Sequence, residues 1–493
     1  MPARGHLGTK ALDILRRLGM AAILAASPLG AAPRQDEADQ VDRYLGSQME
    51  RLRIPGMAVA VVRGGRIVLL RHYGKASVEF NVPVTDETVF SINSVTKAFT
   101  GVAALRLVER GRLDLSAPAG QYLSGLPETW RKVTIRQLLS HMSGLPDIMR
   151  APTVETDAQA AWAWVQTRPV LFTPGDRFHY CQTNYTLIQR ILNQLEGRAP
   201  DAPLAEEQFR IAGMEHTAYG DAYSVIANRA PTYRWNPNGP MIAGYRAPSA
   251  PAPATLAATS ERFLPFRRAS SGLNATAQDL ARWVIALQDH RLLKEESLET
   301  LWTPVAFRDG RPGKWGLGME VLGRGTHRAA GMTGGGRAAF SIYPEDGVAV
   351  VILTNLAGAY PEDMVDKVAS IFAPGLRLSG VPALRILLEE QGYDQINAIA
   401  AGIERADPAL VWSEPELNDW GYRLLSMGRA PQALAVFKLT ADRFPGSANA
   451  HDSLAQAFRV NGDHASAAIH YRRVLALDPG NAEAVRVLKE IAP

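Results

Sequence analysis

Cysteine is almost absent from this chain, with Cys181 the only one among 493 residues. A lone thiol cannot form an internal disulfide bond, whatever the redox state of the compartment. The ten histidines include no His-Glu-x-x-His sequence or similar ligand spacing, so nothing supports a metal site. We therefore expect no metal and no cofactor, and we predict that Cys181 is a small buried residue rather than a reactive thiol.

A strong excess of charge of one sign is also lacking. The formal net charge is +4, and residues 1–32 alone contribute four basic side chains against one acidic side chain. Without that segment the chain is close to neutral, so the high isoelectric point says little about partners. No stretch interleaves basic with aromatic residues as a nucleic-acid-binding patch does. We expect no nucleic-acid partner.

One apolar run bears on targeting. The stretch from Leu18 to Leu29 is largely apolar, and the small residues Gly30-Ala31-Ala32 follow it. Basic side chains precede it, namely Arg4, Lys10, Arg16 and Arg17. This is the pattern of a secretory signal peptide, and the run is shorter than the ~20 residues that a membrane span needs. We predict that residues 1–32 are removed and that the mature protein is periplasmic or secreted, with no stable membrane span. An uncleaved anchor is the alternative.

The most informative segment that is present is Ser94-Val95-Thr96-Lys97. Apolar residues follow it at helical spacing as far as Gly111, which predicts a helix that brings Ser94 and Lys97 onto one face. Serine is a weak nucleophile unless a base lies within reach, and a lysine with a lowered pKa can be that base. We predict Ser94 as nucleophile and Lys97 as its partner. A capping serine beside a surface lysine is the alternative.

Four further blocks follow this segment in a fixed order. They are Val133–Asp147, Pro174–Tyr185, Ser271–Leu280, and Gly331–Gly336 with the adjoining Phe340–Asn355. Together with Phe90–Thr100, the set resembles the serine beta-lactamase-related family over roughly residues 40–375. That family includes class C beta-lactamases, D,D-peptidases, D-aminopeptidases and beta-lactamase-like esterases. The resemblance implies an active site between a sheet and a helical subdomain.

The strand pattern independently predicts a mixed α/β fold. Residues 56–70 read as a hairpin around Arg63-Gly64-Gly65-Arg66, and residues 338–354 read as a second hairpin. Most helical segments lie between the two. A single antiparallel sheet built from both ends of a domain at 33–375, flanked by helices and interrupted by a helical subdomain, satisfies this order. The Pro/Ala-rich residues 247–254 are predicted to form a surface loop.

The resemblance assigns further site residues, and the first departure from the family is among them. Tyr180 stands where the family has the tyrosine of Tyr-x-Asn, which implies proton transfer to the leaving group by a phenolate stabilised near the lysine; core packing is the alternative. The third residue is Gln182 instead of asparagine, and its longer side chain cannot hold a substrate amide in the same geometry. Asn184 is either a substitute for that amide or a packing residue.

The second departure is Met332, in Met332-Thr333-Gly334, where the family has Lys-Thr-Gly or His-Thr-Gly. A cation there helps to bind a substrate carboxylate, and methionine cannot. Thr333, Gly334 and Gly335 retain a backbone role at a strand edge, and the resemblance implies that the N–H groups of the nucleophile and of Gly335 form the oxyanion hole. His327 is five residues from Met332 and is predicted to face away.

These residues favour a secreted serine hydrolase that acts through an acyl-enzyme on an ester or amide of a small molecule or peptide, with esterase-like specificity. A D,D-peptidase, a D-aminopeptidase or a beta-lactamase is the alternative, although the changes at Gln182 and Met332 disfavour anionic substrates. A catalytically degenerate binding or scaffold protein is the alternative from another class. The presence of Ser94, Lys97 and Tyr180 together argues against it.

Residues 376–493 are predicted to be a helical linker followed by two repeats. Residues 416–449 and 450–483 align as units of 34 residues, with glycine, alanine and proline at matching positions. They are similar to tetratricopeptide repeats, each a helix pair ended by proline. Helices near Leu384 and over Ile396–Ile403 are expected to cap the stack. We expect the repeats either to bind a partner protein or to shape the rim of the catalytic cleft.

Overall fold

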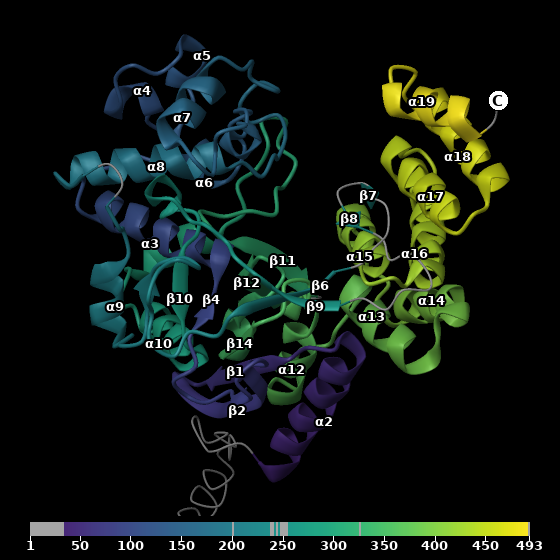
Figure 1. Cartoon of the computed structure of the whole chain (residues 1–493), viewed down its shortest axis with the longest axis horizontal. Helices are drawn as coiled ribbons and strands as arrows, with labels where there is room; N and C mark the ends of the chain where they lie inside the picture. The colour runs from purple at the N-terminus through teal and green to yellow at the C-terminus, as the bar shows by residue number, and fades with distance from the viewer. Residues whose placement is uncertain are drawn as a thin grey trace, which may run out of the picture.

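The computed structural model describes residues 34–199, 202–236, 241–242, 245–246, 255–324 and 327–491. The predicted signal peptide and the Pro/Ala-rich segment 247–254 therefore lie outside the described residues. A catalytic region with a central sheet carries a helical subdomain on one side and a stack of C-terminal helices on another (Figure 1). Across the described part of the chain, no helix combines the length and apolar character needed to cross a membrane.

Seven strands form one sheet in the order β11-β12-β13-β14-β1-β2-β3. Its strands are β1 (Gly56–Arg63), β2 (Arg66–Ser77), β3 (Val82–Pro83), β11 (Glu320–Arg324), β12 (His327–Gly334), β13 (Ala338–Tyr343) and β14 (Val348–Thr354). β1 pairs antiparallel with both β2 and β14, so the two ends of the catalytic region meet at the centre of the sheet. This confirms the predicted antiparallel sheet built from the two hairpins.

Both faces of the sheet are covered, which explains why its central strands read as continuous apolar runs. In β1, Met57, Val59 and Val61 face a core that also contains residues of α2 (Gln35–Leu52) and α12 (Val365–Phe372). The alternate residues Ala58, Ala60 and Val62 join the larger core on the opposite face. That larger core includes α10 (Ala277–Gln288), which contacts β1, β2 and β14.

The segment between β2 and α10 contains the helical subdomain and several short strands. Its helices are α3 (Thr96–Glu109), α4 (Ala119–Tyr122), α5 (Glu128–Arg131), α6 (Ile135–Leu139), α7 (Ala158–Gln166), α8 (Gln182–Leu195) and α9 (Glu206–Ala212). The short strands are β4 (Phe90–Ser91), β5 (Ala218–Tyr219), β6 (Thr232–Asn236), β7 (Met241–Ile242), β8 (Tyr245–Arg246), β9 (Thr255–Thr259) and β10 (Leu273–Ala275). α11 (Glu295–Trp302) follows α10 and packs on α3. The order of sheet, helical insertion and sheet agrees with the predicted mixed α/β class.

The C-terminal helices pack around a core of their own. They are α13 (Gly380–Gln391), α14 (Ile396–Ala406), α15 (Glu414–Ser426), α16 (Ala430–Arg443), α17 (Ala448–Val460), α18 (His464–Leu477) and α19 (Ala482–Ile491). α17 begins 34 residues after α15, and α18 begins 34 residues after α16. The helix pairs therefore repeat with the predicted period. Their assignment as tetratricopeptide repeats stays a prediction from the sequence.

Ion pairs join these helices to the catalytic region. Arg423 of α15 pairs with Asp363 at 2.6 Å, and Glu389 of α13 pairs with Arg51 at 3.0 Å. The partners lie in the turn before α12 and in α2, so the helical stack is attached to the side of the sheet that carries β11–β13 (Figure 1). This places α15 next to the site described below.

Candidate active site

Ser94 lies in the 3₁₀ turn Asn93–Val95, immediately before α3. The preceding residue, Asn93, has a φ of 45°, a left-handed conformation that costs energy for a residue other than glycine. Ser94 is partly exposed, whereas its neighbours Asn93 and Val95 are buried. The strained turn therefore presents the hydroxyl of Ser94 to a cavity at the start of a helix.

Lys97 is the second residue of α3 and is fully buried. Its Nζ lies 3.2 Å from Oγ of Ser94 and 3.0 Å from the carbonyl oxygen of Ser270. Burial, reinforced by the positive charge of Arg267, holds the pKa of Lys97 well below its usual value. A neutral amine at this distance can accept the proton of the serine hydroxyl. The structure thus brings the predicted nucleophile and base together.

Tyr180 completes the group from the coil before α8. Tyr180 lines the same cavity as Ser94, and Nζ of Lys97 lies 4.8 Å from the centre of its ring. Burial raises the pKa of Tyr180, so the protonated phenol is the prevailing form. The expected phenolate is not supported, because the lysine that was to stabilise it is itself held towards the neutral state. Tyr180 is therefore suited to donate a proton.

The two amide side chains near Tyr180, those of Gln182 and Asn184, have different surroundings. Gln182 opens α8, and its Oε1 is buried without a hydrogen-bond partner in the described residues. Asn184 is fully buried, accepts a hydrogen bond from Oγ of Ser143 at 2.6 Å, and contacts Nδ1 of His141 at 3.2 Å. Asn184 is thus a packing residue here, and Gln182 is the amide that remains beside Tyr180.

The strand β12 brings its last residue, Gly334, up to the Ser94 turn. Pairing of β11 with β12 ends at Glu320 and Gly331, which leaves the β11 side of Met332, Thr333 and Gly334 free. A Cβ at Gly334 would lie 2.0 Å from the carbonyl oxygen of Ile92 and 3.1 Å from the backbone nitrogen of the nucleophile. The predicted free strand edge therefore exists, and only glycine fits so near the Ser94 turn.

Gly335, the proposed second donor of the oxyanion hole, follows directly. Its φ of 59° lies in the left-handed region, where a side chain is strained. A Cβ there would also lie 2.2 Å from Nδ2 of Asn93. Gly335 lines the same cavity as Ser94, so its backbone is open to a substrate on that side. Met332, Thr333 and Gly335 thus line the same cavity as Ser94, and Gly334 packs against the Ser94 turn.

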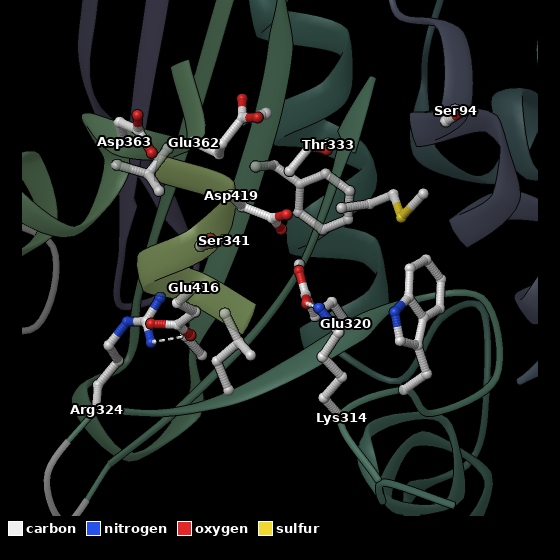
Figure 2. A pocket seen from close by; sticks show the side chains of 18 of the residues that line it. Ser94, Lys314, Glu320, Arg324, Thr333, Ser341, Glu362, Asp363, Glu416 and Asp419 are labelled. Atoms are coloured by element: carbon white, nitrogen blue, oxygen red, sulfur yellow. Dashed lines mark ion pairs between the residues drawn. The ribbon is translucent and has the colours of Figure 1, made fainter. Parts of the chain in front are cut away.

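A cavity of about 400 Å³ opens at Ser94 and Tyr180 and continues between β11, β12 and α15. Figure 2 shows Ser94 at one end and Glu362, Asp363 and Glu416 towards the other. Met332 lines the cavity, whereas His327 bonds Asp346 at 2.7 Å and is not part of the lining, as predicted from its position. In the parts of the chain that are described, no group of three or more His, Cys, Asp or Glu side chains could hold a metal ion.

His141 is a site residue that the sequence reasoning missed. It is fully buried, its Nδ1 accepts the backbone N–H of Cys181 at 3.1 Å, and its ring lies 4.3 Å from that of Tyr180. Burial and the nearby Lys97 hold its pKa well below the usual value, so it is a neutral positioning group. His141 lies two residues after the helix Ile135–Leu139, inside the block Val133–Asp147, which was assigned only by resemblance.

We expect Cys181 to be unreactive in the native protein. It is fully buried, its Sγ lies 3.5 Å from the carbonyl oxygens of Leu145 and Pro146, and burial raises its pKa to about 12. With that pKa only roughly one thiol in ten thousand is ionised at pH 8. Iodoacetamide should therefore label the native protein at least 100-fold more slowly than the urea-unfolded protein. Equal labelling rates in the two states would contradict the buried position.

Comparison with known proteins agrees with this fold. The family model described as Beta-lactamase matches residues 41–372. Protein flp of Staphylococcus aureus (strain N315) is 26% identical over 219 residues, which are 42% of this chain and 43% of flp. D-aminopeptidase of Gluconobacter oxydans (strain 621H) is 27% identical over 312 residues, which are 61% of this chain and 56% of that protein. The chain thus spans about half the length of these curated relatives.

Two solved structures share the architecture. The octameric penicillin-binding protein homologue from Pyrococcus abyssi is 20% identical, with a TM-score of 0.58 over 72% of this chain and 82% of that one. The D-amino acid amidase from Ochrobactrum anthropi SV3 is 24% identical, with a TM-score of 0.55 over 65% and 92%. The family match covers well over half of the sequence and includes Ser94, Lys97, Tyr180 and the whole of β12. This protein belongs to the beta-lactamase family.

Proposed function

We propose that this protein is a serine hydrolase that cleaves an ester or amide bond through an acyl-enzyme on Ser94. The observation that carries the proposal is the 3.2 Å separation between Nζ of Lys97 and Oγ of Ser94 in a buried site that lowers the lysine pKa. A neutral amine in contact with a hydroxyl is the arrangement that nucleophilic catalysis by serine needs. The predicted signal peptide would place this activity in the periplasm or outside the cell.

Acylation begins when Oγ of Ser94 attacks the carbonyl carbon and its proton passes to the neutral Nζ of Lys97. The N–H groups of Ser94 and Gly335 are the proposed donors to the oxyanion that forms. Collapse breaks the bond to the leaving group, which takes a proton from the hydroxyl of Tyr180 and departs as an alcohol or amine. The proton on Lys97 then returns to Tyr180, which restores both groups.

Deacylation follows the same route in reverse. Tyr180 first passes its proton to the neutral Nζ of Lys97. The phenolate so formed takes the proton of a water molecule as it attacks the acyl carbon, and Lys97 then donates its proton to Oγ of Ser94 as the acyl bond breaks. The acid is released, and the free serine is regenerated. The raised pKa of Tyr180 and the lowered pKa of Lys97 support these roles, since Tyr180 must enter the cycle protonated and Lys97 must enter it neutral.

A neutral group next to the scissile bond is the substrate feature that the site favours. Met332 lines the cavity where relatives in this family carry a cation, and the basic side chains of the lining, in the described residues, are already paired with carboxylates. Those basic residues are Lys314, Arg324, Arg385 and Arg423. An ester is therefore our first proposal, and a beta-lactam, with its carboxylate, is disfavoured. The resemblance to a D-aminopeptidase supports an amide as the second substrate class that we propose.

The test compares three chromogenic substrates with the mature protein and its Ser94→Ala variant. We expect a p-nitrophenyl ester of a short acid to be turned over, a D-alanine p-nitroanilide less efficiently, and a cephalosporin least. Mass spectrometry should find the acyl group on the peptide that contains Ser94. Efficient cephalosporin turnover would contradict the argument that Met332, in place of a cation, disfavours a substrate carboxylate. An absence of Ser94-dependent turnover on all three would favour a scaffold, with the repeat helices binding a partner protein.

A further inference from the structure

The wall of the cavity opposite the Ser94 turn comes from outside the region that the family model matches. α15 contributes Glu416, Asp419 and Arg423 to the lining, and spacings of three and four residues put them on one helix face. Figure 2 shows the side chain of Asp419 pointing from α15 towards the middle of the cavity. The C-terminal helices therefore supply part of the substrate-binding surface.

The charged groups of this wall are paired, with one exception. Glu320, Asp363 and Glu416 each form an ion pair with a basic side chain of the lining, namely Lys314, Arg385 or Arg423, and Arg324 respectively. Asp419 forms neither a hydrogen bond nor an ion pair with any described residue. Glu362 pairs with Arg423 through Oε1 at 3.5 Å, and its Oε2 is buried without a partner in the described residues. The wall thus offers one unpaired carboxylate, that of Asp419, to the cavity.

Asp419 is exposed to the cavity that it lines, and no basic side chain of the described residues pairs with it. A donor that enters the cavity can therefore reach its carboxylate. A ligand cation would supply both the opposite charge and the hydrogen bonds. The site should therefore prefer substrates that carry a positive charge.

We propose that Asp419 binds a positively charged group of the substrate, and that this group is an ammonium at the far end of the acyl chain from the scissile bond. The proposal rests on hydrolysis at Ser94. The cavity lining also includes apolar side chains that suit a chain of methylene groups, namely Trp315, Leu322, Met332 and Phe340. Figure 2 shows Ser94 on one side of the cavity and Asp419, on α15, across from it.

The test uses p-nitrophenyl esters of ω-aminohexanoic and ω-aminooctanoic acid, each paired with its N-acetyl form. We expect kcat/KM to be about tenfold higher for the free amine, as one charge-assisted hydrogen bond predicts. Asp419→Asn should bring this ratio close to one. Asp442→Asn is the matched control, because Asp442 is an exposed carboxylate of α16 outside the cavity lining.

Asp419→Lys provides a second variant, which should reverse the preference in favour of the p-nitrophenyl monoester of adipic acid. Equal rates for amine and N-acetyl esters in the unchanged protein, or the same ratio in Asp419→Asn, would overturn the proposal. Calorimetric binding of n-hexylamine against n-hexanol to the Ser94→Ala protein separates this question from catalysis. Amine binding that is lost in Asp419→Asn would support the site even if no ester were hydrolysed, whereas no preference for the amine would refute it.

Discussion

Substitution of Lys97 with methionine is expected to lower kcat/KM for a neutral ester by about 10³-fold, within the range that general-base catalysis contributes. Methionine is similar in length to lysine and has no basic nitrogen. The fully buried position 97 can accept it with little loss of packing. The Oγ of Ser94 would then have no base at 3.2 Å, and the hydroxyl would remain a weak nucleophile.

The pH dependence gives this prediction a readout that a packing defect would not produce. Activity needs neutral Lys97, so the rate should rise with pH through the pKa of Lys97 in the folded protein, well below the ordinary value of 10.5. Arg267→Gln removes the positive charge that helps to lower this pKa, and the rising limb should move to higher pH. If Lys97→Met keeps more than a tenth of the activity with an unchanged pH profile, Lys97 is not the base.

The sequence predicted those features that depend on local order along the chain. The apolar strand pattern and the turn residues predicted the two hairpins, which are β1–β2 and β13–β14 in the structure. The Ser-x-x-Lys spacing, on a helix that begins after Ser94, predicted that the hydroxyl and the amine lie close together. These inferences need only the residue types and the conformation of a few neighbours. The departures at Gln182 and Met332, in contrast, were visible only through the resemblance to the family.

Features that depend on how distant segments dock could not be obtained in this way. The amphipathic pattern of α15 predicts a helix, but it does not say that Asp419 faces a cavity containing Ser94. The packing role of Asn184 became evident only when α8 was placed against His141 and Ser143. The protonated state of Tyr180 depends likewise on burial by residues remote in sequence. Tertiary packing decided these points.

The close approach of the backbone at Gly334 to the backbone of the Ser94 turn can be tested by a single substitution. Gly334→Ala is expected to lower kcat for an ester about 100-fold, a loss typical for removal of one oxyanion donor. The new Cβ would meet the carbonyl oxygen of Ile92 at 2.0 Å, so β12 and the Ser94 turn would have to separate. That movement would carry Gly335 N–H away from the oxyanion, since Gly335 is the next residue.

Gly323→Ala in the neighbouring strand β11 is the control, because a Cβ at Gly323 would meet nothing within 4 Å. Both variants replace a strand glycine with alanine, so a general effect on strand stability should appear in both thermal melts. Only Gly334→Ala should lose kcat, with KM changed less, because the oxyanion exists in the transition state and not in the bound substrate. Wild-type kcat in Gly334→Ala would mean that the N–H of Gly335, directly after β12, does not hold the oxyanion, and the donor would then have to come from another part of the cavity.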